Sequence, residues 1–361
     1  MNRRRRRRPD RCVTRGFEVG GRARSIRVTA IGHTAHRPPE DQERTVISEL
    51  QNEFHDLPVV QFPTDDATPT PTVEGPVAWR ISADTYDAEI EWPEAFAKFR
   101  AAVDPASVTA IVVGSWSEPY ENSSAGVVDA LVAAADELPA LRALFIGDMT
   151  VEDCEISWIV QSDLTALLTA FPRLERLGVR GGTQLALSPV RHENLRSLVI
   201  ESGGLPADLV RAVAASDLPA LTDLELWLGT EEYGGDSSVD DVAPILSGEK
   251  FPKLTRLALA NSDHQDAIAS AVATAAVVPQ LRALDLSKGV LTDTGAESLL
   301  AGQSLTHLES LDLHHNYLSS GMRERLQAAL APSVAHLDLD LGDADEDDYD
   351  GTIYRSVAVG E

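Results

Sequence analysis

This chain is predicted to fold as an α/β solenoid, because one short phrase recurs along it at intervals of 21 to 33 residues. The phrase has apolar residues at positions one, four and six, and it starts at Leu141, Leu174, Leu195, Leu221, Leu254, Leu281, Leu308 and, in a weaker form, Val334. Positions four and six lie two residues apart, so they point to the same face of a short strand. Apolar stretches with helical spacing lie between copies. The pattern is typical of a leucine-rich-repeat horseshoe, with a parallel β-sheet on the concave face and helices on the convex face.

Two further units are expected before Leu141. Residues 108–113 (VTAIVV) and 77–81 (VAWRI) are predicted to be strands, with Trp79 and Ile81 facing the core. A helix is expected to start near Pro93, because proline fits the first helical position. Upstream of these units, three apolar residues are expected to cap the open end of the solenoid: Leu50, Phe54 and Val59.

Helices are expected between the strands, and proline marks where many of them end. The helical stretches lie around 127–132, 164–168, 209–213 and 299–300. An X-Pro pair stands just before five of the strands, at Pro139, Pro172, Pro219, Pro252 and Pro279. Proline cannot continue a helix and biases its predecessor toward extended backbone, so each pair restarts the repeat.

The sequence predicts four parts. Residues 1–45 are a basic extension, 46–105 a capping region with the first strand and helix, 106–341 the repeats, and 342–361 an acidic linker with a short apolar peptide. We expect the extension to be disordered, with the composition of upstream DNA translated from a wrong start codon, so that the true start lies near Val46. For the apolar peptide three alternatives stay open: it is frayed, it folds back on the last repeat, or it is offered to a partner.

The charge is distributed unevenly. The formal net charge is −26, but residues 1–44 hold 13 arginines against 5 acids, so the rest of the chain carries −34. Such a field repels nucleic acid and anionic lipid and favours basic partners. Only Cys12 and Cys154 are present, so a disulfide within the chain is not expected. We therefore expect a cytoplasmic protein that binds neither nucleic acid nor membranes.

Three units are longer than the others, and their extra residues fall between strand and helix, on one rim of the horseshoe. These loops combine acids with aromatic residues, which protein interfaces tend to use as anchors. The predicted partner-binding rim residues are Trp116, Tyr120, Trp158, Trp227 and Tyr233. The alternative is that these rings pack back onto the rim.

Charged residues are also expected on the concave face. Aligned carboxylates on strands about 4.8 Å apart repel one another, a cost most easily tolerated where something cationic binds. The predicted concave binding residues are Arg176, Arg180, Glu201, Asp223, Glu225, Asp285, Asp312, His314 and Asp338. The two arginines would make one end of the groove positive. The alternative is an acidic surface kept for solubility.

Catalytic signatures are missing from the sequence, which has no G-x-S-x-G, phosphate-binding loop, H-E-x-x-H or dinucleotide glycine cluster. Asp312, His314 and Asp338 offer ligand types for a zinc-like ion, but their spacing matches no metal motif. We therefore assign no catalytic residue, cofactor or metal.

Several segments resemble an uncharacterised bacterial cytoplasmic family of leucine-rich-repeat proteins with ribonuclease-inhibitor-like repeats. They are FHDLPVVQFP, CEISWIVQSD, LGVRGG, ESGGLP, LELWLGTEEYGG, LDLHHNYLS and YRSVAVGE. The resemblance covers nearly all of the chain after residue 45. It implies neighbouring radical-SAM, ATP-grasp-like and hydrolase proteins in a shared modification pathway, and it supplies no catalytic residue.

The sequence thus predicts a non-enzymatic scaffold that binds a basic protein or peptide through the concave face and the rim loops. Two alternatives stay open. One is a metal-dependent or acid/base enzyme that uses Asp312, His314 and Asp338 and is accessory to a modification pathway. The other is a purely structural assembly protein.

Overall fold

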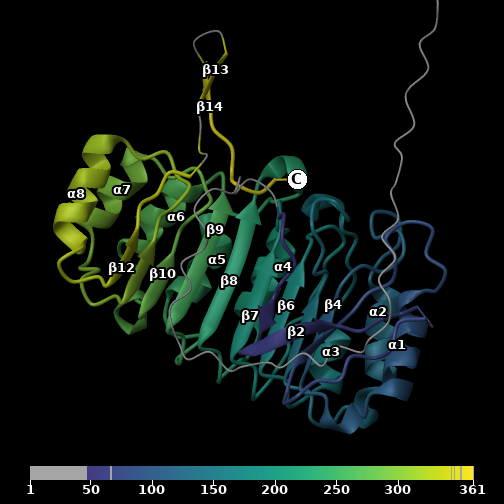
Figure 1. The fold of residues 1–361 in the computed structure, drawn as a ribbon. Coiled ribbons are helices and arrows are strands. Elements are labelled where there is room, and N and C mark those ends of the chain that lie inside the picture. The colour runs from purple at the N-terminus through teal and green to yellow at the C-terminus, as the bar shows by residue number, and fades with distance from the viewer. Residues whose placement is uncertain (1–46, 66, 343, 345, 350–351, 361) are drawn as a thin grey trace, which may run out of the picture.

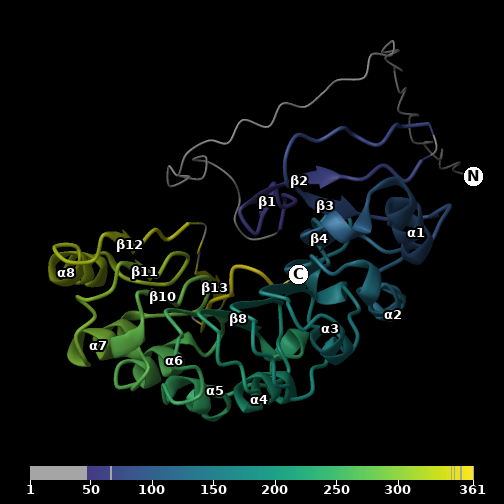
Figure 2. The same cartoon turned by 90° about the horizontal axis from the view of Figure 1, so that it is seen from below.

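A computed structural model describes residues 47–65, 67–342, 344, 346–349 and 352–360. The predicted extension 1–45 lies outside the described residues, as do positions 343, 345 and 350 of the acidic run. Twelve strands form one sheet whose spatial order follows the chain order, and strands β2 to β12 run parallel (Figure 1). Seen from below, the strands line the inner side of an arc and helices line its outer side (Figure 2). The chain is a leucine-rich-repeat solenoid, as predicted.

The strands are short, as the six-residue phrase requires. They are β1 (Glu53–Phe54), β2 (Leu57–Gln61), β3 (Ala78–Ile81), β4 (Ala110–Val113), β5 (Ala143–Ile146), β6 (Arg176–Arg180), β7 (Ser197–Glu201), β8 (Asp223–Gly229), β9 (Arg256–Ser262), β10 (Ala283–Asp285), β11 (Ser310–Asp312) and β12 (His336–Asp338). The helices are α1 (Trp92–Ala102), α2 (Ala125–Ala133), α3 (Thr165–Ala170), α4 (Ala207–Ala215), α5 (Val239–Leu246), α6 (Gln265–Val272), α7 (Asp293–Ala301) and α8 (Ser320–Leu330).

The fourth position of the phrase sets the register of the sheet. Leu144 pairs with Leu177, Leu177 with Leu198, and the ladder of leucines continues through to Leu337 in β12. These leucines are buried except Leu337, which is half-buried in the last repeat strand. One continuous apolar core therefore runs between the sheet and the helices.

Between β3 and β12, one interval departs from the strand-plus-helix pattern. The chain passes from β6 to β7 without an α-helix, which fits the shortest spacing, 21 residues, in the sequence. His192 takes over part of the packing in this interval. Its ring is buried, Nδ1 accepts the backbone N–H of Leu195 at 3.0 Å, and Nε2 lies 3.1 Å from the carbonyl of Phe171.

Both ends of the described chain return to the concave side. Strand β2 pairs with β3, while Phe54 lies against Phe145, with ring centroids 5.9 Å apart. At the other end, β13 (Asp347–Tyr349) and β14 (Thr352–Tyr354) form an antiparallel hairpin that projects from the arc (Figure 1). The segment after the hairpin folds back toward β8 and β9, in the middle of the sheet rather than at the last repeat, and buries Val357–Val359.

None of the helices in the described part of the chain combines the length and the apolar character that crossing a membrane requires.

Candidate functional site

The N-terminal half of the concave face is apolar and covered. Its outward positions carry small or apolar residues, and Phe54 packs over them: Ala78, Ala110, Val112, Ala143 and Phe145. The guanidinium of Arg176 lies 5.3 Å from the ring centroid of Phe54, in a cation–π contact. Arg176, predicted to be part of a positive spot, is thereby placed against the N-terminal segment.

A buried ion network lies beside this apolar area. Asp148, whose side chain has no exposed surface, accepts a hydrogen bond from Nε of Arg80 at 2.8 Å and lies 3.6 Å from Nη1 of Arg180. Arg180 also donates to Glu201 at 2.7 Å and to the carbonyl of Met149 at 2.7 Å. The predicted pair Arg180 and Glu201 is therefore brought together, with its charges compensated within the chain.

The same network holds the N-terminal segment in place. The backbone N–H of Gln51 donates to Asp148 at 3.2 Å, and its carbonyl accepts from Arg80. The carbonyl of Ile47 accepts from Val151 at 2.8 Å. The paired side chains Arg80 and Asp148 thus hold the backbone of the segment 47–51 against the concave side.

Arg256 compensates the first predicted acids of the concave face. Its guanidinium lies 2.8 Å from Glu225, 2.9 Å from Asp223 and 3.4 Å from Asp285. Burial acts to raise the pKa of Glu225, but Arg256 and Lys288 outweigh it and hold that pKa below its usual value. These three carboxylates therefore form a shared ion cluster around one cation.

Beyond Arg256 the carboxylates line up. Asp285, Asp312 and Asp338 are direct neighbours in the parallel ladder of β10, β11 and β12. Each also accepts the backbone N–H two residues further on, at 2.9 to 3.0 Å, so the aspartates have a local role in closing the strand ends. We name the surface made by these three residues, together with the exposed Asp340, the acidic ladder.

The acidic ladder contains a pair of interacting carboxyl groups. Burial, and then the negative charge of Asp312, raise the pKa of Asp285. Burial would also raise the pKa of Asp312, but the hydrogen bonds and charge of His314, together with the charge of Lys288, outweigh it and lower that pKa. Neighbouring aspartates are thus pushed in opposite directions, as expected when two like charges share a site.

His314 completes a group of three ligand types. Its Nδ1 lies 2.7 Å from Oδ1 of Asp312, and one ligand atom each from Asp312, His314 and Asp338 lies within 4.8 Å of the others. This geometry brings together the three residues that the sequence suggested for a cation.

The predicted rim aromatics fall into different environments. Trp116 is only 4% exposed, and its indole donates to the carbonyl of Asn122 at 2.8 Å. Tyr120 is half-buried, with its ring 6.1 Å from that of Tyr86. Trp158 is 59% exposed, as is Tyr86, whose hydroxyl donates to the carbonyl of Asp153 at 3.2 Å. We name Tyr86, Tyr120 and Trp158 the aromatic rim.

The other two predicted aromatics meet the C-terminal segment. Trp227 is 5% exposed, donates to Glu225 at 2.8 Å, and packs in one apolar cluster with Ala358 and Val359. Tyr233 lies beside Gly360, where an added methyl group would come within 2.9 Å of the ring. Whether any rim residue binds a partner stays a prediction.

Cys154 lies in the longest rim loop and is buried. Burial, helped by the charges of Glu155 and Asp153, raises the pKa of its thiol to about 12. The thiol is therefore protonated at neutral pH and unsuited to act as a nucleophile.

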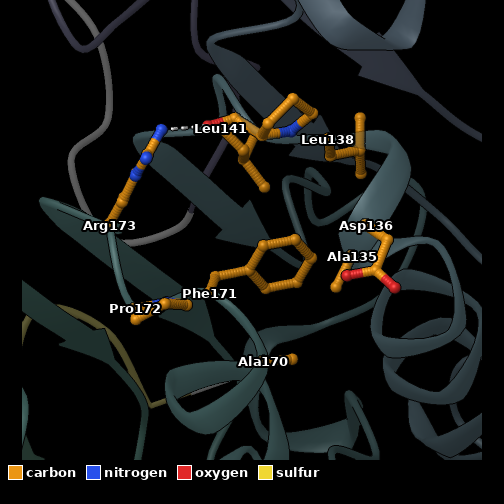
Figure 3. Close-up of a pocket in the computed structure, with 9 residues that line it drawn as sticks. Ala135, Asp136, Leu138, Leu141, Ala170, Phe171, Pro172 and Arg173 are labelled. Carbon is orange, nitrogen blue, oxygen red and sulfur yellow. Dashed lines mark hydrogen bonds between the residues drawn. The ribbon is translucent and has the colours of Figure 1, made fainter.

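A hollow of about 270 Å³ lies on the opposite edge of the solenoid (Figure 3). It is lined by the restart segments of two successive repeats: Ala135, Asp136, Leu138, Pro139, Leu141, Ala170, Phe171, Pro172 and Arg173. Arg173 crosses it and donates to the carbonyl of Pro139 at 3.4 Å. Because Asp136 and Arg173 are its only ionisable groups, the hollow offers little chemistry.

Sequence reasoning missed three residues that organise these surfaces. Arg256 occupies position three of its phrase, as the predicted Arg176 and Asp223 do, and this shared position is the signal that could have found it. Tyr86 follows a strand in a short loop, with no aromatic neighbour in sequence. Asn261 has a left-handed backbone, with φ of 55°, and its side chain contacts a segment 98 residues away, which no local pattern signals.

Comparisons with solved structures show what this chain is similar to. A Bacteroides fragilis protein, solved by crystallography as a structural-genomics target, is 32% identical, with 70% of this chain and 71% of that chain covered and a TM-score of 0.65. An internalin from Listeria monocytogenes is 17% identical over 64% of this chain and 72% of its own, with a TM-score of 0.26. No protein-family profile matches the chain, and no curated protein sequence does.

Proposed function

This chain belongs to the same family as the Bacteroides fragilis protein of known structure, and from its surfaces we propose that it is a non-enzymatic scaffold that binds a basic protein or peptide. The proposed binding surfaces are the acidic ladder and the aromatic rim. A reducing, cytoplasmic setting suits the single thiol, Cys154, that the described part of the chain holds.

The observation that carries the proposal is the direct alignment of Asp285, Asp312 and Asp338. Parallel strands lie about 4.8 Å apart, so adjacent carboxylates repel unless a cation lies between them. Burial, and after it the negative charge of Asp312, raise the pKa of Asp285. A lysine or arginine side chain from a partner would relieve it, and the exposed positions of Asp338 and Asp340 leave access from solvent.

The aromatic rim supports a protein partner rather than a small cation alone. Trp158 and Tyr86 keep 59% of their surface exposed, and carboxylates of the same loop lie beside them. Large exposed aromatic side chains next to charge are favoured anchors at protein interfaces. The resemblance noted above makes a protein of a shared modification pathway the partner to look for first.

Affinity capture with three forms of the full chain tests the proposal. We expect the unsubstituted chain to capture a partner with a basic binding segment. The double variant Asp312→Asn with Asp338→Asn should capture at least tenfold less of this partner. The control, Asp208→Asn with Glu324→Gln, removes two charges from the convex helices and should retain the partner. Equal capture by all three forms would contradict binding at the acidic ladder.

The aromatic rim is tested separately with Trp158→Ala and Tyr86→Ala. Because both rings are largely exposed, thermal stability should change little, while capture of the same partner should fall. Retention of the partner by both variants would restrict the binding surface to the acidic ladder.

The group Asp312, His314 and Asp338 favours a second candidate function, binding of a divalent cation. Isothermal titration with zinc and with calcium tests it, with His314→Ala as the comparison. Heat of binding that is unchanged by His314→Ala would remove this candidate.

A further inference from the structure

The C-terminal segment returns to the concave side at the carboxyl ends of the central strands (Figure 1), and we name the group of residues that it packs against there the notch. Ile156, Trp227 and Ala260 form its floor, and Val357, Ala358 and Val359 of the segment are 6%, 2% and 1% exposed. The floor residues come from three different repeats. The notch is therefore a feature of the assembled arc rather than of any single repeat.

The notch holds the segment mainly through its backbone. Nδ2 of Asn261 donates to the carbonyl of Val359 at 2.6 Å, and Oδ1 of the same side chain accepts the N–H of Val359 at 3.0 Å. The N–H of Ala358 donates to the carbonyl of Lys288 at 2.8 Å, and Ser157 donates to the carbonyl of Gly360. The fully buried side-chain amide of Asn261 thus bonds to both the N–H and the carbonyl of Val359. These two bonds do not depend on which side chain stands at position 359.

Asn261 is itself fixed in position. Its backbone N–H donates to Ser287 at 2.9 Å, and Nδ2 also reaches the carbonyl of Ser202 at 3.2 Å. Leaving a buried amide without its partner is unfavourable, because the group has lost its hydrogen bonds to water. The notch is therefore built to pair with an extended backbone, and it is incomplete without one.

Two glycines restrict what the notch can hold. A Cβ at Gly203 would lie 2.1 Å from the carbonyl oxygen of Gly360, so only glycine allows the segment to approach the wall. A Cβ at Gly360 would lie 2.9 Å from the ring of Tyr233. The fitting occupant is an extended stretch with small apolar side chains followed by glycine.

We propose that this notch is a recognition site for extended peptide segments of the pattern apolar, small, apolar, glycine. The partner is a second protein that presents such a segment, and the chain's own Val357–Gly360 is the resident competitor. Val357–Gly360 has no charged side chain, and the attachment of this segment through the β13–β14 hairpin gives it the advantage of high local concentration. This site is distinct from the acidic ladder, and it stands even if no basic partner binds there.

The test releases the resident segment within the full chain. Val359→Asp places a charge at an apolar, buried position, and Ile353→Asp is the matched control, because Ile353 lies six residues earlier and is 45% exposed. A fluorescent peptide with the sequence of residues 355–360 is then titrated and followed by anisotropy. We expect the Val359→Asp chain to bind it at least tenfold more tightly than the unsubstituted chain and the Ile353→Asp chain.

Two further arms test the recognition itself. Asn261→Ala in the Val359→Asp background should abolish peptide binding, and a peptide with valine in place of the glycine should bind more weakly, because its Cβ would come within 2.9 Å of the Tyr233 ring. A folded Val359→Asp chain that binds no peptide, or that binds the valine peptide equally well, would overturn the proposal. Size-exclusion chromatography without added peptide shows whether two copies of the chain associate through the notch. Such association would mean that the partner is a second copy of this chain, and it would overturn the choice of a different protein.

A measurement on the unsubstituted chain covers the case in which Val359→Asp does not fold. Excess peptide should increase amide hydrogen exchange at Ala358 and Val359 at least tenfold, while Leu226 in β8 stays protected. Equal protection of all three amides with and without peptide would also overturn the proposal.

Discussion

The two halves of the concave face share one core pattern and differ in everything that faces outward. In β3 to β5 the outward residues are alanine, valine and phenylalanine, covered by Phe54, together with Arg80, which is buried and paired with Asp148. In β10 to β12 they are mainly aspartate and histidine, and Asp338 and His336 are exposed. The leucines fix the sheet equally in both halves, so the outward positions can vary independently. One half of the face has become an internal contact, and the other stays accessible.

The comparison predicts that charge matters most where it is buried. Asp148→Ala leaves Arg80 and Arg180 without their buried counter-ion and should lower the free energy of unfolding by about 3 to 5 kcal/mol. Urea denaturation followed by circular dichroism measures this. Asp208→Ala, whose side chain is 94% exposed, should stay within about 0.5 kcal/mol of the unsubstituted chain. A similar loss in both variants would mean that burial does not set the cost of removing a charge.

The apolar cover of the N-terminal half gives the next largest effect. Phe54→Ala removes a buried ring that contacts Phe145 and should cost about 3 kcal/mol. Amide exchange should also rise at Val59, whose N–H is bonded to the carbonyl of Asn52 at 2.9 Å. The exposed neighbour Glu53→Ala serves as the control. If Val59 stays protected in Phe54→Ala, the N-terminal segment is held by the ion network alone.

In the acidic half, Arg256→Gln should cost less, about 1 to 2 kcal/mol at pH 7, because the guanidinium is 34% exposed and screened. Since the pKa of Glu225 is lowered in the folded chain, its contribution is present at neutral pH and is lost as the pH falls through that lowered value. The variant and the unsubstituted chain should therefore converge in stability well below pH 4. A difference that does not depend on pH would contradict an ionic role for Arg256.

Asp285→Asn should have the smallest effect and the opposite sign. Because burial and Asp312 raise the pKa of Asp285, its ionised form is disfavoured in the folded chain, and this penalty grows as the pH rises through the raised value. The variant should gain roughly 0.2 to 1 kcal/mol at pH 7 and nothing at pH 3. Thermal melting at both pH values measures the change, with the exposed Asp338→Asn as the comparison. Destabilisation at pH 7 would mean that Asp285 is needed for its bonds to Ser287.

The repeat phrase was sufficient to predict the sheet because each leucine depends only on its own repeat and the next. The short interval before Leu195 even matches the connection without an α-helix. The contacts Phe54–Phe145, Arg80–Asp148 and Asn261–Val359 join residues far apart in sequence. Nothing in the periodicity relates such pairs. The sequence therefore identified the charged and aromatic residues, but it did not show which of them make contacts within the chain. Arg180 and Trp227 are two that do.

The fastening of both ends of the described part of the chain across the arc sets an order for biosynthesis. Repeats that touch only their neighbours can assemble one after another while the ribosome is still extending the chain. The bond from Ser157 to Gly360 spans 203 positions, and Ile47 borders the same apolar cluster as Val359. That closure must wait until translation has reached Gly360. A nascent or prematurely stopped chain would therefore display Trp227 uncovered, a state that a chaperone could distinguish from the finished protein.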